Sequence, residues 1–345
     1  HPMAVDQAQK GVAFQGGQDA LGLARKPQTY WSMAFASLRR DKLTIVALSF
    51  IAVISLLALG AGVITNAIGV SPTQTNPANQ FQQPYLIPYL QWMLGIDPLT
   101  APTMLYKSGG ATHWLGADQL GRDQLARLLY GARISLSIAL VAAGLSMVLG
   151  VGVGAVAGYF GGRVDDVIMW FIATLTTIPE IYLLIIVNSI FRPTPLTLTL
   201  FLGFLGWFGT ARFMRGNVFK VRMLEYTTAA RAVGASNYRI LLRHVIPNSL
   251  PIIVVITAVD VGALILTESI QSFLGLGVQP PTPTWGNMLP LPGDFVFLRD
   301  PVTKEFLGLH LLIWPGVLIT LTVLSFYLIG DGLRDALDPM LKNKK

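Results

Sequence analysis

The sequence contains no cysteine, which excludes disulfide frameworks, thiolate metal sites, iron–sulfur clusters and thiol nucleophiles. Histidine is also scarce, and its four residues, at positions 1, 113, 244 and 310, do not have the spacing of metal ligands. The chain lacks a G-x-x-x-x-G-K-S/T phosphate loop, a nucleophile elbow and an H-E-x-x-H motif. We therefore expect no catalytic residue, no bound metal, no cofactor and no enzymatic activity in this chain.

Charged residues are few. They make up 12% of the 345 residues, whereas about one quarter of an ordinary soluble domain is charged. Hydrophobic residues make up 52%, and the chain holds 34 glycines and 21 prolines. Transmembrane helices tolerate Gly and Pro better than soluble helices do. The composition indicates a protein that is embedded in a lipid bilayer.

Long apolar runs are present. A helix needs about 20 largely apolar residues to cross a bilayer, and six runs approach or exceed this length. They cover residues 43–65, 134–160, 167–191, 194–211, 247–270 and 306–330. The sequence therefore predicts an all-α polytopic membrane protein with six transmembrane helices.

The basic residues indicate how the chain is oriented. Six spans place both termini on one side, and cytoplasmic segments carry an excess of Lys and Arg. With cytoplasmic N- and C-termini, 18 of the 25 basic residues lie inside and 7 outside. The net charge of +7 is thus explained by topology, and we expect no nucleic-acid partner.

These spans divide the chain into segments. Residues 1–42 form a predicted cytoplasmic segment in which Trp31, Phe35 and Leu38 have helical spacing and precede basic residues, as in a helix lying on membrane lipid. A plain extension of the first span is the alternative.

Segments 66–133 and 271–305 are predicted outer loops, the second rich in proline. These loops suit docking of an external partner or capping of the bundle. Residues 134–330 form a five-helix core, and 331–345 a cytoplasmic tail.

The longest predicted cytoplasmic loop, residues 212–246, suggests a docking element. Its pattern predicts a helix over 220–233, a stop at Gly234, a cap at Ser236 and a second helix over 238–245. Small residues beside a turn let a backbone approach another surface closely. An ordinary basic loop is the alternative.

The stretch TTAARAVGASNYRILLRHVIPN in this loop resembles the EAA signature of ABC importer permeases, in the variant typical of dipeptide and oligopeptide importers. Thr228 stands where the general signature has Glu. Three further stretches resemble the C-type permease subunit of that family: HWLGADQLGRDQLARLLYGARISLSIAL, LTESIQSFLGLGVQPPTPTWGNML and GDGLRDALDP. The resemblance implies a type I ABC importer permease fold.

The resemblance also implies partners. It suggests a heterodimer with a homologous permease subunit, two ATP-binding subunits that hold ATP and Mg, and an extracytoplasmic solute-binding protein, all at the inner membrane of a prokaryote. The expected substrate is a dipeptide or oligopeptide, with metal chelates or oligosaccharides as alternatives in the same family. The loop would be the coupling helix seated in an ATP-binding subunit. Its candidate contact residues are Glu225, Ala229, Ala230, Arg231, Gly234, Ala235, Ser236 and Arg239.

Three acids lie within predicted spans: Glu180, Asp260 and Glu268. A charge there is costly unless it faces water, protein or a partner. One hypothesis is a translocation path that attracts the amino group of a peptide, with Glu180 and Asp260 at similar depth. The acids could instead be packed in the bundle, and Glu268, which is nearer the outer mouth, could simply fix the outer loop. A further alternative is that Glu180 and Asp260 couple protons in a secondary transporter.

Two other patterns predict structure rather than function. Asp123 fits the first turn of a helix, with Arg127 four residues on as its ion-pair partner. Gly150, Gly154 and Gly158 clear one helix face for close packing.

Overall fold

The computed structural model describes residues 38–39, 41–84, 86, 113–191, 193–290, 299, 306 and 308–337. Helices form nearly all of the regular structure in these ranges. The α-helices are α3 (Lys42–Leu59), α4 (Ala61–Ile68), α7 (Gln124–Phe160), α8 (Gly162–Thr176), α9 (Glu180–Ile190), α10 (Pro195–Val221), α11 (Glu225–Ala232), α12 (Asn237–Ile240), α13 (Ile246–Phe273) and α14 (Leu309–Leu337). A 3₁₀ turn covers Pro77–Asn79, and a π-helical turn over Leu241–Val245 joins α12 to α13. The predicted amphipathic helix around Trp31 lies outside the described residues.

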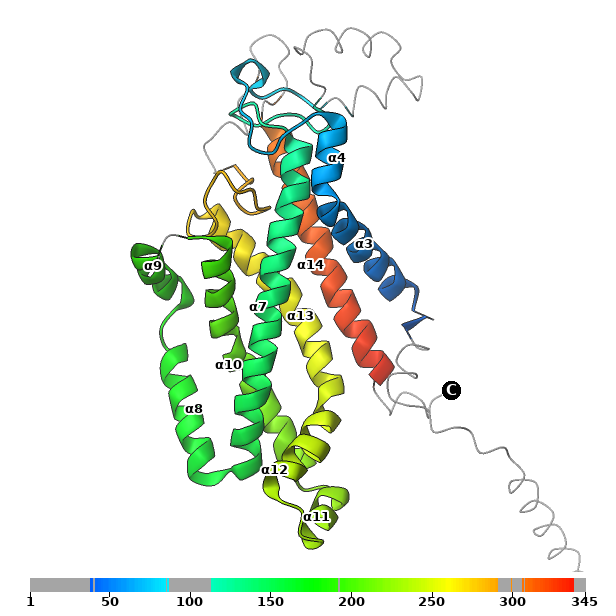
Figure 1. The fold of residues 1–345 in the computed structure, drawn as a ribbon, viewed down its shortest axis with the longest axis vertical. Coiled ribbons are helices and arrows are strands. Elements are labelled where there is room, and N and C mark those ends of the chain that lie inside the picture. Colours follow the sequence, from blue (N-terminus) through cyan, green and yellow to red (C-terminus); the bar gives the residue numbers. More distant parts are fainter. Residues whose placement is uncertain are drawn as a thin grey trace, which may run out of the picture.

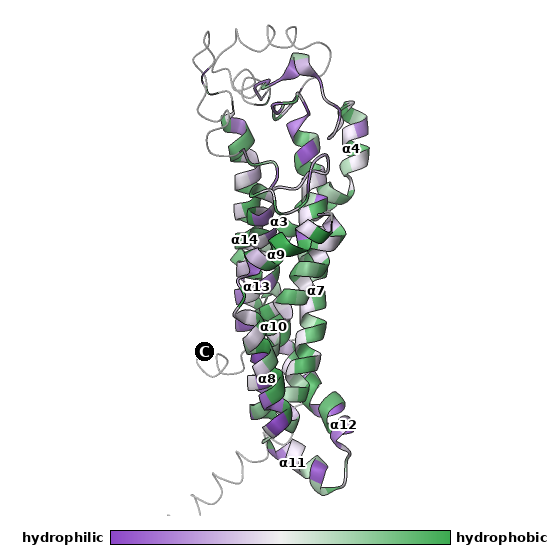
Figure 2. Cartoon of the chain, turned by 90° about the vertical axis from the view of Figure 1, so that its left-hand side faces the viewer, coloured by the Kyte–Doolittle hydropathy of each residue, from purple (hydrophilic) through white to green (hydrophobic). Residues whose placement is uncertain are grey.

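The helices form an elongated bundle (Figure 1). Five helices in the described ranges are long and apolar enough to cross a membrane, and α8 with α9 makes a sixth span if the bent pair is counted as one. Figure 2 shows hydrophobic residues along the bundle and more hydrophilic residues toward its ends. The predicted all-α polytopic fold is confirmed.

The second span begins earlier than predicted. α7 starts at Gln124, and the side chain of Asp123 caps it by accepting a 2.7 Å hydrogen bond from the Ala126 amide. This first part is polar, so the apolar run in the sequence begins only at residue 134. The helix therefore extends into the segment predicted as outer loop.

The third span is broken. α8 and α9 meet at an angle of 76°, and the break coincides with Pro179, which lacks an amide hydrogen and disfavours helical backbone at the residue before it. The hydroxyls of Thr176 and Thr177 donate to the carbonyls of Ile172 and Thr174 at 2.9 and 2.6 Å.

Small residues hold α7 against α10, as predicted. A Cβ atom on Gly150 would lie 2.5 Å from the Thr210 Cβ, and one on Gly154 would lie 2.3 Å from the Ala211 carbonyl oxygen. At Gly158 the nearest atom would be the Arg215 carbonyl oxygen, at 2.7 Å. No larger residue fits at these positions without moving one of the two helices.

The start of α3 lies beside the end of α14. The Thr44 hydroxyl lies 3.4 Å from the Leu328 carbonyl oxygen, and Gly332 leaves room for the Thr44 side chain. The first and last described helices thus meet at one flank of the bundle (Figure 1).

Candidate functional site

The connection between α10 and α13 projects from one end of the bundle, where α11 and α12 form its tip (Figure 1). α10 continues to Val221, so the first predicted loop helix is divided: its beginning belongs to α10, and α11 starts at Glu225. Gly234 has a φ of +83° and lies just beyond the end of α11, while Ser236 caps α12 by accepting from the Arg239 amide at 3.4 Å. The predicted stop and cap are confirmed.

Hydrogen bonds brace this projection against the bundle. The buried Thr227 hydroxyl donates to the Val221 carbonyl at 3.1 Å, and the Tyr159 hydroxyl, near the end of α7, donates to Asn237 Oδ1 at 2.9 Å. The Asn248 amide donates to the Tyr226 hydroxyl at 2.7 Å. The projection is therefore fixed to α7, α10 and α13.

A basic side chain completes the brace. Arg222 donates from Nη1 to the carbonyls of Gly158 and Tyr159 at 3.0 and 3.1 Å, which satisfies carbonyls at the end of α7. Cations are also favoured at the C-terminal end of a helix. Arg222 thus links the end of α10 to the end of α7.

The predicted contact residues lie in two layers of the projection. Ala230 and Ala235 are half-buried and pack against a core cluster that includes Tyr159 and Ile240. The others are exposed: Glu225, Ala229, Arg231, Gly234, Ser236 and Arg239.

Sequence reasoning missed the apolar side chains of the projection. Val233 is 86% exposed, and Met223 and Tyr238 are each 72% exposed. The signal available in the sequence was the presence of large apolar residues on both sides of the Gly234 turn in an otherwise polar loop. We call Met223, Val233 and Tyr238 the apolar tip.

The intramembrane acids have three different environments. Glu268 is fully buried and accepts hydrogen bonds from Ser135 on α7 and Ser272 on α13, at 2.9 and 2.7 Å. Glu180 is exposed at the start of α9 and accepts from Gln271 Nε2 at 2.9 Å. Asp260 is half-exposed in the middle of α13. In the described ranges no hydrogen bond or ion pair joins any two of these acids.

Glu268 belongs to an anchor for the outer loop that follows α13. The Trp285 amide donates to the Ser135 hydroxyl at 3.3 Å, and the Trp285 indole donates to the Leu128 carbonyl at 3.2 Å. Gly286 approaches α13 so closely that a Cβ would lie 2.4 Å from the Ser269 carbonyl oxygen. This part of the predicted outer loop is therefore packed against α7 and α13.

The predicted ion pair between Asp123 and Arg127 is wrong. Asp123 pairs instead with His113, with 2.6 Å between Oδ2 and Nδ1, while Arg127 Nε lies 3.5 Å from Asp118 Oδ2. Asp118 also pairs with Arg122 at 2.7 Å. Asp123 uses Oδ1 as the helix cap and Oδ2 for His113, and Arg127 points toward a different acid in the folded outer segment.

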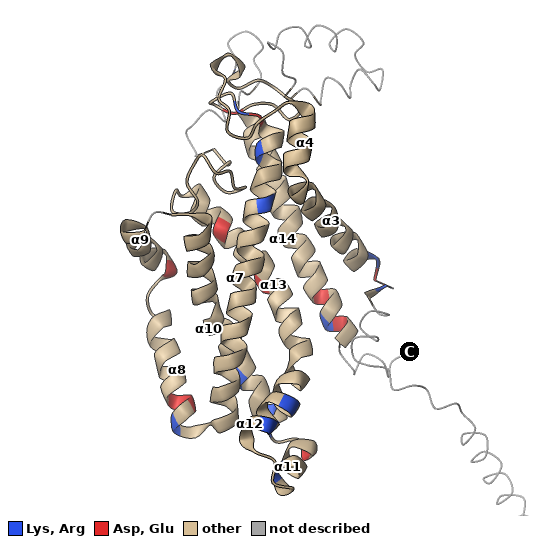
Figure 3. Cartoon of the chain, in the orientation of Figure 1, with Lys and Arg blue, Asp and Glu red and all other residues tan. Residues whose placement is uncertain are grey.

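Charge is distributed unevenly along the bundle. Figure 3 shows Lys and Arg at the end that carries α11 and α12, near the start of α3 and the end of α14, and also toward the start of α7, with few charges in the middle. In the part of the chain that the structure describes, no group of three or more His, Asp or Glu side chains could hold a metal ion.

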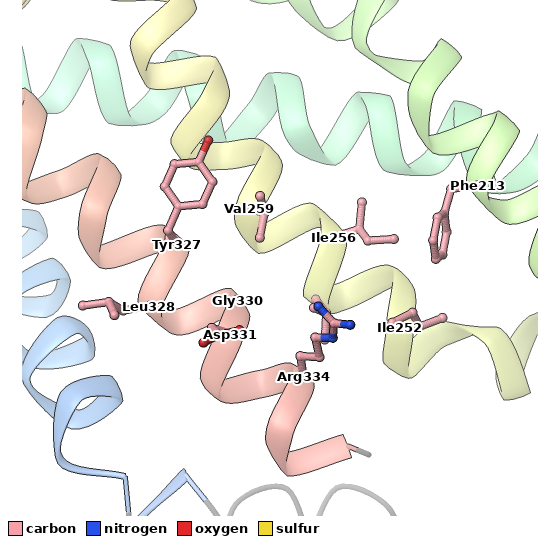
Figure 4. Close-up of a pocket in the computed structure, with 10 residues that line it drawn as sticks. Phe213, Ile252, Ile256, Val259, Tyr327, Leu328, Gly330, Asp331 and Arg334 are labelled. Atoms are coloured by element: carbon pink, nitrogen blue, oxygen red, sulfur yellow. The ribbon is translucent and has the colours of Figure 1, made fainter. Parts of the chain in front are cut away.

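An open groove of about 650 Å³ lies between α13 and α14, with Phe213 of α10 at one side (Figure 4). Its walls are mainly apolar, and Asp331 and Arg334 supply charge from α14. Val259, the neighbour of Asp260, also lines the groove. The groove is thus an apolar surface with a polar margin.

The bundle and its braced projection define a multi-pass membrane protein with an element suited to contact another protein. The family model described as "Binding-protein-dependent transport system inner membrane component" matches residues 150–343, and "N-terminal TM domain of oligopeptide transport permease C" matches residues 29–84. The chain belongs to this family of inner membrane transport components and has the type I ABC importer permease fold.

Curated relatives cover most of the chain. The dipeptide transport system permease protein DppC of Alkalihalophilus pseudofirmus is 34% identical over 91% of this chain and 91% of its own length. The oligopeptide transport system permease protein OppC of Bacillus subtilis is 31% identical over 94% of each chain. The glutathione transport system permease protein GsiD of Pectobacterium atrosepticum is 39% identical over 69% of this chain and 76% of its own. The resemblance to peptide importer permeases is confirmed.

Proposed function

We propose that this chain is a permease subunit of a bacterial ABC importer for short peptides. The names of its relatives support the substrate class, because they specify dipeptide, oligopeptide and glutathione transport. The chain would form one wall of the translocation path and would not hydrolyse ATP itself. ATP and Mg would be held by two separate ATP-binding subunits.

The observation that carries the proposal is the apolar tip on its braced support. Three large apolar side chains are exposed on a projection that is hydrogen-bonded to α7, α10 and α13. Large apolar side chains that are exposed to water gain free energy when another protein surface buries them. Docking of an ATP-binding subunit would bury this tip, and the brace would transmit the movement of that subunit to the spans.

The other partners follow from the same assembly. A homologous permease subunit would complete the path, and an extracytoplasmic solute-binding protein would deliver peptide at the end opposite α11 and α12. In this orientation the tip and both chain termini are cytoplasmic, in agreement with the basic residues at that end of the bundle (Figure 3).

Site-directed cross-linking tests the docking. The chain has no cysteine, so single-cysteine variants report one position each. In the assembled complex, we expect Val233→Cys to cross-link to an ATP-binding subunit. The matched control is Thr73→Cys. Thr73 is exposed and follows α4, which lies at the opposite end of the bundle (Figure 1), so this variant should not cross-link to an ATP-binding subunit.

A second measurement separates this function from proton-coupled transport. The complex in proteoliposomes should import peptide only with ATP and the binding protein. Uptake driven by a pH gradient without ATP, together with no Val233→Cys cross-link, would show a secondary transporter instead.

A further inference from the structure

Two charged side chains beside the α8–α9 break have no opposite charge to pair with in the described ranges. Glu180 accepts from the neutral amide of Gln271 at 2.9 Å, and Arg212 donates to the neutral hydroxyl of Thr176 at 2.9 Å. Both charged residues are exposed. One turn further along α10, by contrast, Arg215 pairs with Asp165 of α8 through two guanidinium nitrogens. The break thus presents one carboxylate and one guanidinium that are free to bind a ligand.

A second, independent observation is an unpaired hydrogen-bond acceptor on Gln271. The residue is 6% exposed, and its Oε1 is buried without a hydrogen-bond partner among the described residues. A buried acceptor that stays unpaired costs free energy, so such groups are rare in folded proteins. The Nε2 atom of Gln271 donates to the Glu180 carboxylate. The Gln271 side chain therefore lies beside this carboxylate, and its Oε1 is left as an unused acceptor.

The surroundings favour contact with water or protein over contact with lipid. The two helices that flank the break are together long and apolar enough to count as one span, and exposed charge in a span is costly in contact with hydrocarbon. The surface that carries Glu180 and Arg212 must therefore face water or another subunit in the assembled transporter. A path for a charged solute satisfies this condition.

The two charges are also linked to positions that are close together in the sequence. Arg212 is hydrogen-bonded to Thr176, which is four residues before Glu180. Four residues span at most about 14 Å when they are fully extended, which sets an upper limit on the separation of the Thr176 and Glu180 backbones. This limit fits a short peptide better than a long one.

We propose that the α8–α9 break is a binding site for both charged ends of a short zwitterionic peptide. Glu180 and Gln271 would bind the ammonium group, and Arg212 would bind the carboxylate. This inference rests on the proposed function, since it names the chemistry that the path would recognise. It also predicts that the permease itself distinguishes peptides with free termini from blocked ones.

Ligand-observed NMR on the assembled complex in nanodiscs, without the binding protein, tests the site. The probes are trialanine, N-acetyl-trialanine and trialanine amide. Glu180→Gln should weaken binding of trialanine and its amide roughly tenfold or more, the effect of losing a charge-assisted hydrogen bond, and leave N-acetyl-trialanine unchanged. Arg212→Gln should weaken trialanine and N-acetyl-trialanine and leave the amide unchanged.

Leu56→Ala, an exposed change on α3, is the control and should bind all three probes as the wild type does. No binding of trialanine to the wild-type complex, or equal losses for all three probes, would overturn the inference. ATP-driven uptake with the binding protein is measured on the same wild-type complex. If uptake is present without the NMR pattern, only this inference fails, whereas absence of uptake contradicts the proposed function.

Discussion

The hydroxyl of Tyr159, near the end of α7, donates a 2.9 Å hydrogen bond to the side chain of Asn237, at the start of α12. This contact joins a long span to the projection for which we propose docking of an ATP-binding subunit. The Arg231 guanidinium also lies 6.0 Å from the centre of the Tyr159 ring. Tyr159 is therefore placed to couple α7 to both short helices.

Removing the Tyr159 hydroxyl should loosen this coupling. For Tyr159→Phe we expect a loss of about 0.5–1.5 kcal/mol in the local stability of the projection, the usual net contribution of one hydrogen bond. Amide hydrogen exchange in residues 225–240 should become faster, and less peptide should be imported per ATP hydrolysed. Tyr327→Phe is the control, because in the described ranges the Tyr327 hydroxyl makes no hydrogen bond. Unchanged exchange in both variants would contradict the role of Tyr159.

Glu268 should be required for the stability of the outer end of the bundle. Its carboxylate is fully buried and accepts from Ser135 and Ser272. Glu268→Leu leaves both hydroxyls without their acceptor, and each buried donor that loses its partner costs about 1–3 kcal/mol. We expect a lower apparent Tm of the detergent-solubilised protein and easier proteolysis near Trp285. Glu180→Gln, at an exposed acid, should leave the Tm unchanged.

Asp118 should stabilise the folded outer segment. It lies 2.7 Å from Arg122 and 3.5 Å from Arg127, and all three side chains are buried. Asp118→Asn leaves two buried guanidinium groups without a carboxylate, and breaking a buried pair typically costs about 3–5 kcal/mol. The apparent Tm should fall clearly. Asp331→Asn, an exposed acid near the end of α14, is the matched control, and an equal fall in both variants would contradict the assignment.

The spans could be predicted from the sequence because apolar length depends on local composition. The cap at Ser236 and the turn at Gly234 were predictable for the same reason, since each depends on one residue type at one place. A helix beginning at Asp123 was predicted, but its continuity with the second span was missed, because its first turns are polar and are buried by a folded outer segment that apolar length does not detect. Gln124 and Arg127 are both almost fully buried there.

The candidate sites were less predictable because their contacts join distant parts of the chain. Glu180 and its partner Gln271 are 91 residues apart, so no local pattern connects them. The exposure of Val233 likewise depends on where the bundle places the projection. Helical spacing predicted Arg127 as the partner of Asp123. The observed partner, His113, lies in the outer segment before the helix, so helical spacing does not predict it.

The interface between α7 and α10 gives a direct test of helix packing. A Cβ on Gly154 would lie 2.3 Å from the Ala211 carbonyl oxygen, so Gly154→Ala must push the two helices apart. Overpacking of this kind costs about 1–3 kcal/mol, and we expect a lower apparent Tm.

Gly152, two residues away on the same helix, is the matched control. It has open space where a Cβ would lie, with no neighbouring atom within 4 Å. Gly152→Ala should therefore leave the Tm unchanged or raise it, because Ala favours helix over Gly by up to about 1 kcal/mol. Equal effects of the two substitutions would show that helix propensity, and not contact with α10, determines the outcome.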